Sequence, residues 1–122
     1  MSHVTTHVLD AAVGTPAAGV PVQLFAVSAL RAAALLGSPA TPPSATELLA
    51  SGITDANGRI PSLGPNVLAS GTYRLVFDTA AYFAGQPTFY PSVTIDFAVT
   101  DAAHYHVPLL LSPFAYSTYR GS

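Results

Sequence analysis

Short stretches in which apolar and polar residues alternate, separated by glycine- and proline-rich turns, run through most of this 122-residue chain. The clearest stretch is Ser92–Val99, one face of which carries Val93, Ile95, Phe97 and Val99. Strict alternation places successive side chains on opposite faces of a strand. Seven to eight short strands of this kind predict an all-β fold, an antiparallel β-sandwich with one or two short helices. With no internal repeat, we expect a single domain over residues 1–122.

The same reasoning places the remaining elements along the chain. Further strands are predicted at Val4–Asp10, Val20–Val27, Glu47–Thr54, Thr72–Phe77, His104–Leu111 and Phe114–Tyr119. A short helix is expected at Asp78–Gly85, capped by Asp78 and ended by Gly85. The connector 28–46 is predicted to hold a second helix, Ser28–Gly37, followed by a loop rich in proline.

A strong turn signal precedes one of the four arginines. Asp55-Ala56-Asn57-Gly58 contains an Asn-Gly pair, and both residue types adopt the positive φ of tight turns at little steric cost. Arg59 follows immediately, so we expect a hairpin to fix the position of its side chain.

Charge is scarce in this sequence. Charged residues make up 8% of the chain, whereas ordinary domains have about 25%. So few charged side chains cannot cover the surface of a monomer of this size. We therefore expect part of the surface to be buried in an oligomer. A net charge of -2 without a basic cluster argues against nucleic acid as a partner. No signal peptide or membrane span is recognisable, which favours a soluble intracellular protein.

Few side chains could carry chemistry. The chain has no cysteine, so thiolate sites are excluded. His104 and His106 emerge on one face of a strand and could be half of a metal site, but no segment supplies further ligands, so no metal is expected. His3 is expected to be solvated near a fraying terminus. Taken singly, His7 and Arg59 fit ordinary polar residues as well as functional ones.

Three stretches together resemble a known family, the 5-hydroxyisourate hydrolases, transthyretin-like enzymes of urate breakdown. The similarity lies in Thr6–Asp10 with Gly14–Ala17, in Ser51–Arg59, and in His104–Ser122, which closes with Tyr-Arg-Gly-Ser. The long connector 28–46 departs from the family, whose members usually have a shorter one.

The resemblance implies a transthyretin-like sandwich that assembles as a homotetramer. It implies that the lactam ring of 5-hydroxyisourate is opened to 2-oxo-4-hydroxy-4-carboxy-5-ureidoimidazoline, without a cofactor. Matching the motifs residue by residue gives His7, Arg59, His106 and Ser122 as catalytic residues, with His7, Arg59, Tyr119 and Arg120 as substrate-binding residues.

Residue chemistry agrees with these roles without assigning all of them. A neutral histidine can take a proton from water, and His106, or the His7–His106 pair, is the candidate base. Arg59 can grip a planar polar edge and stabilise charge that develops on oxygen. Ser122 can orient a histidine or the water, and Tyr119 can hold the ring. Which histidine acts as the base is left open by the sequence.

A carrier is the rival interpretation, because transthyretin uses the same fold to bind thyroid hormones. Carriers of that kind have Lys, Glu and Thr where this chain has His7, Arg59 and His106, and they lack the terminal Tyr-Arg-Gly-Ser. The hydrolase is therefore the preferred prediction. We expect a cytoplasmic location, with the peroxisome as the alternative.

Overall fold

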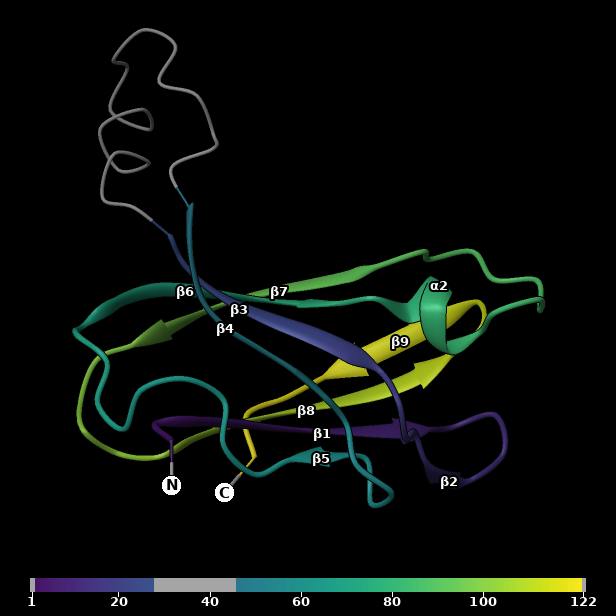
Figure 1. Cartoon of the computed structure of the whole chain (residues 1–122), viewed down its shortest axis with the longest axis horizontal. Coiled ribbons are helices and arrows are strands. Elements are labelled where there is room, and N and C mark those ends of the chain that lie inside the picture. Colours follow the sequence, from purple (N-terminus) through teal and green to yellow (C-terminus); the bar gives the residue numbers. More distant parts are fainter. Residues whose placement is uncertain (1, 28–45, 122) are drawn as a thin grey trace, which may run out of the picture.

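The computed structural model describes residues 2–27 and 46–121, and these form two β-sheets packed face to face (Figure 1). The predicted helix Ser28–Gly37, and the loop after it up to residue 45, lie outside the described residues. Nine strands are described, two of them only two residues long, and they form two facing sheets, so the predicted β-sandwich is confirmed.

The first sheet is built around β1 (Val4–Asp10) and β8 (Tyr105–Ser112), which pair along seven residues. On its other edge, β1 pairs with β5 (Arg59–Ile60) and β2 (Thr15–Pro16), while β9 (Ala115–Thr118) pairs with β8. The β1–β8 pair is parallel, unlike the other pairs of this sheet. Alternation alone does not reveal this direction, because both kinds of strand have a period of two.

The second sheet has the order β4 (Thr46–Ile53), β3 (Pro21–Val27), β6 (Gly71–Phe77) and β7 (Val93–Val99), with every pair antiparallel. The helix α2 (Thr79–Tyr82) follows β6, and the Asp78 carboxylate accepts a hydrogen bond from the Ala81 amide as predicted. This helix is shorter than expected, since it ends before Gly85, whose φ is 78°.

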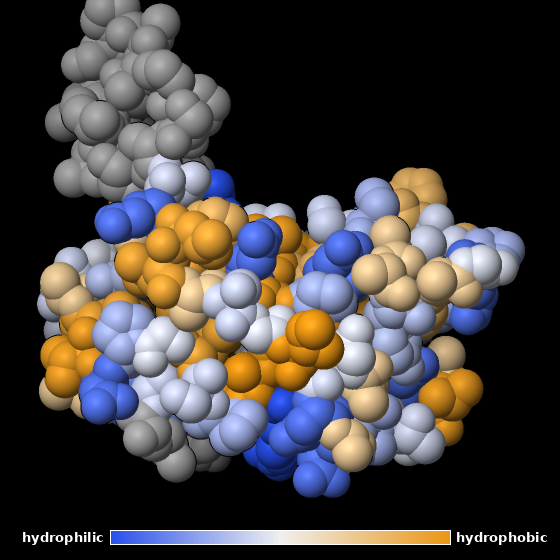
Figure 2. All heavy atoms as spheres, viewed as in Figure 1, coloured by the Kyte–Doolittle hydropathy of each residue, from blue (hydrophilic) through white to orange (hydrophobic). Residues whose placement is uncertain are grey.

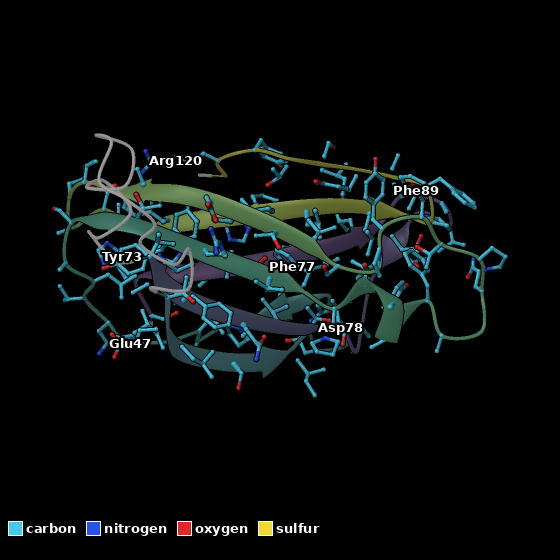
Figure 3. The ribbon with its side chains drawn as sticks, turned by 90° about the horizontal axis from the view of Figure 1, so that it is seen from above. Glu47, Tyr73, Phe77, Asp78, Phe89 and Arg120 are labelled. Atoms are coloured by element: carbon cyan, nitrogen blue, oxygen red, sulfur yellow. The ribbon has the colours of Figure 1, made fainter. Side chains whose placement is uncertain are left out.

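The core lies between the sheets, where alternate side chains from both inner faces meet. Tyr73, Leu75 and Phe77 of β6 are buried there, as the alternation predicts; Figure 3 labels the first and last of them. Tyr105, Val107, Leu109 and Leu111 of β8 face them from the first sheet. The intervening residues of β1 and β8 therefore point away from the core, onto the outer face of the first sheet.

Two sequence predictions are wrong. The Asp55–Gly58 turn forms, but it is not a hairpin, because β4 before it belongs to the second sheet and β5 after it belongs to the first. His3 is not solvated: it is 4% exposed, accepts a hydrogen bond from the Leu68 amide at Nδ1 and donates from Nε2 to the Ala103 carbonyl. Local patterns do not show which distant segments will cover a residue.

Both ends of the described chain lie beside β8 (Figure 1), since the Tyr105 amide donates to His3 and Gly121 bridges His106. Within residues 2–27 and 46–121, no helix is long and apolar enough to cross a membrane.

Candidate active site

Strand register brings the predicted residues together. Thr5 and His7 are two apart on β1, so both point to the outer face of the first sheet. The parallel partner β8 places His106 beside Thr5, and the short antiparallel partner β5 places Arg59 beside His7. Three strands far apart in sequence thus present two histidines and a cation on one surface.

The position of Arg59 depends on the turn before it. The Asp55 carboxylate accepts hydrogen bonds from the Asn57 amide at 2.9 Å and the Arg59 amide at 3.0 Å. Gly58 lies against β1, where its carbonyl accepts from the Val8 amide at 2.7 Å and its φ is +73°. A Cβ atom at this position would overlap the Val8 carbonyl oxygen, so only glycine fits.

The C-terminal tail closes one side of the surface. The Gly121 amide donates to the His106 carbonyl at 2.8 Å, which fastens the tail along β8. Tyr119 contributes to the same surface and stays 57% exposed. Ser122 lies outside the described residues, so its predicted role stays a prediction.

Arg120 lies elsewhere. Its Cζ atom is 4.3 Å from the centre of the buried Tyr105 ring, and it does not line the cleft formed by the other predicted residues. Figure 3 labels Arg120 at the rim of the molecule. The Tyr105 hydroxyl donates a hydrogen bond to the Asp101 carboxylate at 3.0 Å. The pKa of Asp101 is lowered, first by the hydrogen bond from the Ala103 amide, then by the one from Tyr105, and also by the charge of Arg120. This placement points to a role in holding the tail.

These elements enclose a cleft of about 560 Å³ on the outer face of the first sheet. It is lined by Thr5, Thr6, His7, Arg59, Ile60, Pro61, His104, His106, Pro108, Tyr119 and Gly121. The described lining residues include no carboxylate, and Arg59 and the histidines are the charged or titratable groups that distinguish this cleft. Among the described residues, no group of three or more His, Cys, Asp or Glu side chains is placed to hold a metal ion.

His106 is held in one orientation within this cleft. Its Nδ1 atom lies 2.8 Å from the Thr5 hydroxyl, which leaves Nε2 as the ring nitrogen free of a partner among the described residues. The pKa of His106 is lowered from 6.5, first by burial and then by the charges of Arg59, His7 and His104. The ring is therefore neutral near pH 7, the form that can accept a proton.

Sequence reasoning missed Thr5 and the contact of His104. The Thr5 hydroxyl lies 2.8 Å from Nε2 of His104 as well as from the His106 ring. The spacing could have revealed Thr5, because a residue two before His7 shares its face of the strand.

Fold and cleft together define a transthyretin-like β-sandwich with a histidine- and arginine-lined cleft on one outer face. The chain belongs to the HIUase/Transthyretin family, whose pattern matches residues 4–121. Among curated relatives, the 5-hydroxyisourate hydrolase of Deinococcus radiodurans is 45% identical over 124 residues, covering 97% of this chain and 94% of the relative.

Solved structures agree in fold over almost the whole chain. The 5-hydroxyisourate hydrolase of Klebsiella pneumoniae has a TM-score of 0.77 and 36% identity, and the match covers 98% of both chains. Sea bream transthyretin in complex with thyroxine has a TM-score of 0.74 and 31% identity, covering 97% of this chain and 93% of the other. The fold is thus shared by proteins named as hydrolases and by a hormone-binding protein.

Proposed function

We propose that this chain hydrolyses 5-hydroxyisourate in urate degradation, with His106, His7 and Arg59 as its central catalytic residues. The relatives from Deinococcus radiodurans and Klebsiella pneumoniae bear that activity in their names, in agreement with the expectation from the sequence. The observation that carries the assignment of residues is the cleft itself, where a histidine of lowered pKa lies near an arginine and no described lining residue is a carboxylate.

His106 is the general base in this proposal. Its Nε2 atom removes a proton from a water molecule while the water oxygen adds to the lactam carbonyl carbon. Two features support His106 over His7 in this role. Its pKa is lowered, so the neutral form prevails near neutrality, and its Nδ1 atom is already engaged by Thr5, which fixes the ring.

Arg59 stabilises the negative charge that develops on the carbonyl oxygen, because a guanidinium presents several donors in a fixed plane. His7 lies beside Arg59 across the β1–β5 pair and is placed to bind a polar edge of the substrate. Tyr119 holds the ring from the tail side of the cleft. Arg120 acts indirectly through the position of the tail, because its guanidinium stacks on Tyr105.

A carrier is the second candidate, favoured by the structural match to transthyretin with thyroxine bound. A hormone carrier needs a site that binds without reacting. His7, Arg59 and His106 line this cleft, whereas the carriers have Lys, Glu and Thr at the corresponding positions. These three residues therefore favour the hydrolase. Cofactor-free catalysis is part of the proposal, and a cytoplasmic location stays a prediction.

A homotetramer of about 50 kDa, four times the 12.5 kDa chain, is the proposed assembly. Large apolar side chains are exposed on the single chain, among them Phe89, Phe114, Tyr116 and Tyr119. Figure 2 shows broad apolar areas between the polar side chains of one face. β7 and β9 are unpaired sheet edges on the described chain, so both can extend the sheets of a second copy.

The direct test of the function follows the ultraviolet absorbance of freshly made 5-hydroxyisourate with and without the protein. The hydrolase accelerates the decay in proportion to protein concentration. Binding of substrate or thyroid hormone without acceleration would favour the carrier.

A further inference from the structure

The hydroxyl of Thr5 joins two histidine rings. Its Oγ1 atom is 2.8 Å from Nδ1 of His106 and 2.8 Å from Nε2 of His104. Thr5 is 9% exposed, and its hydroxyl has no third partner among the described residues. A hydroxyl has one proton to donate, so it donates to one ring and accepts N–H from the other. The tautomers of the two rings are therefore coupled.

Only one of the two arrangements suits a base at His106. If Thr5 donates to His106 Nδ1, the proton of the neutral ring sits on Nε2, which then cannot accept another. If Thr5 donates to His104 Nε2 instead, His106 donates from Nδ1 and keeps a free lone pair on Nε2, toward the substrate. The side chain at position 5 thus selects which nitrogen of the base is available.

His104 stands at the outer end of this chain of hydrogen bonds. It is exposed to solvent, whereas Thr5 is buried and His106 is half-buried. The described groups that face His106 are Thr5 and His7 from β1, Arg59 from β5, His104 immediately before β8, and Tyr119 and Gly121 from the tail. None of these described groups is a carboxylate, so among them no strong acceptor is available for a proton taken up by His106.

We propose that His106, Thr5 and His104 form a proton relay from the cleft to solvent. The inference rests on the proposed hydrolase function. Opening an amide to a carboxylate at neutral pH consumes one water: its oxygen bonds to the carbonyl carbon, and the carbon–nitrogen bond breaks. One water proton ends on the leaving nitrogen, and the other is released to solvent when the new carboxylic acid ionises.

The relay carries the proton that His106 takes from the attacking water, and its reversal returns a proton for the leaving nitrogen. His106 Nε2 accepts it from water and releases its Nδ1 proton to the Thr5 oxygen, while the Thr5 proton passes to His104 Nε2. His104 then loses a proton to solvent. The final state is the mirror arrangement, in which His104 donates to Thr5 and Thr5 donates to His106. The opposite transfers, with a proton taken up again at His104, take place as His106 Nε2 protonates the leaving nitrogen, so the ring stays neutral and Nε2 is free again.

Steady-state kinetics on 5-hydroxyisourate with three variants tests the relay. Thr5→Val keeps the shape of the side chain but loses the hydroxyl, so kcat falls by about tenfold or more while KM changes little; the loss can be smaller than the roughly hundredfold or more that a general base itself supplies. Thr5→Ser keeps the hydroxyl and recovers most of the loss. His104→Ala lowers kcat, and added imidazole buffer restores it because a small base replaces the missing ring.

The outcomes are separable. A wild-type protein without activity contradicts the hydrolase function itself. If the wild type is active and the Thr5→Val variant is equally active, the relay is overturned. It is also overturned if His104→Ala loses activity that imidazole does not restore, because His104 would then have a purely structural role. Nitrogen-15 NMR of the wild type supplies a readout independent of activity: the relay requires a proton on Nδ1 and a bare Nε2 at His106 in the resting protein.

Discussion

Gly121 lies so close to His106 that a Cβ atom built on it would stand 2.6 Å from Cδ2 of the imidazole ring. The tail therefore covers the ring and limits its movement. Side chains cannot approach so closely, and one of the two groups would have to shift if the glycine were replaced.

Gly121→Ala is expected to displace the tail or tilt the His106 ring, and so to lower kcat by about tenfold to a hundredfold, the scale on which small misplacements act. Gly71→Ala is the matched control, since a Cβ there meets nothing within 4 Å. Initial rates of both variants, with circular dichroism to verify folding, measure the effect. Equal rates for the two variants would mean that contact with the tail does not matter to His106.

The pH dependence of kcat/KM reports the state of the base. The pKa of His106 is lowered from 6.5 by burial and by nearby positive charge, and its neutral form is the active one. As the pH falls, kcat/KM should decline with a midpoint below 6.5. NMR titration of the His106 ring should give the same midpoint. A decline centred above 6.5 would contradict this assignment of the base.

Arg120→Ala separates a role in the tail from a role in substrate binding. Because Arg120 stacks on Tyr105 instead of lining the cleft, its removal should loosen the tail and reduce kcat more than it raises KM. The amide of Gly121 should exchange faster with solvent in the variant. A large rise in KM with kcat unchanged would restore the direct substrate contact expected from the sequence.

Assembly is tested at Leu110. This half-buried residue lies on the outer face of the first sheet, beside Leu9 on β1 and Ser117 on β9. Leu110→Glu should split the tetramer into dimers that keep their β-sheet signal, because a buried charge without a partner is costly. These dimers should lose most activity as water enters the cleft. Light scattering and rate measurements check both points; a native monomer would refute the assembly.

Much of the fold could be predicted from local patterns, because alternation and turn residues act over a few neighbours. Val93–Val99 forms the predicted strand, and Asp78 caps the helix as expected. Pairing between distant segments could not be predicted this way. The Asp55–Gly58 turn crosses from one sheet to the other, and the parallel pairing of β1 with β8 depends on contacts about a hundred residues apart.

In the candidate site, too, some residues could be predicted from the sequence and others depend on long-range contacts. His7, Arg59, His106 and Tyr119 were named from sequence motifs, and the structure brings all four to one cleft. Thr5 was missed because its importance comes from two hydrogen bonds to residues 99 and 101 positions away. Substrate binding by Arg120 stays a prediction, and the stacking of its guanidinium on Tyr105 is a long-range contact that the motif alone does not reveal.

The most direct test of the central claim is the initial rate of 5-hydroxyisourate consumption by a folded His106→Asn variant. Asparagine keeps polarity at this position but cannot act as a base near neutrality. The rate should fall by about a hundredfold or more, as for other general bases, and His7→Asn and Arg59→Ala should show losses of similar size. Arg74→Ala, on the second sheet and paired with Asp96, is the control expected to keep the wild-type rate. A folded His106→Asn protein that hydrolyses the substrate at the wild-type rate would contradict the assignment of the catalytic base.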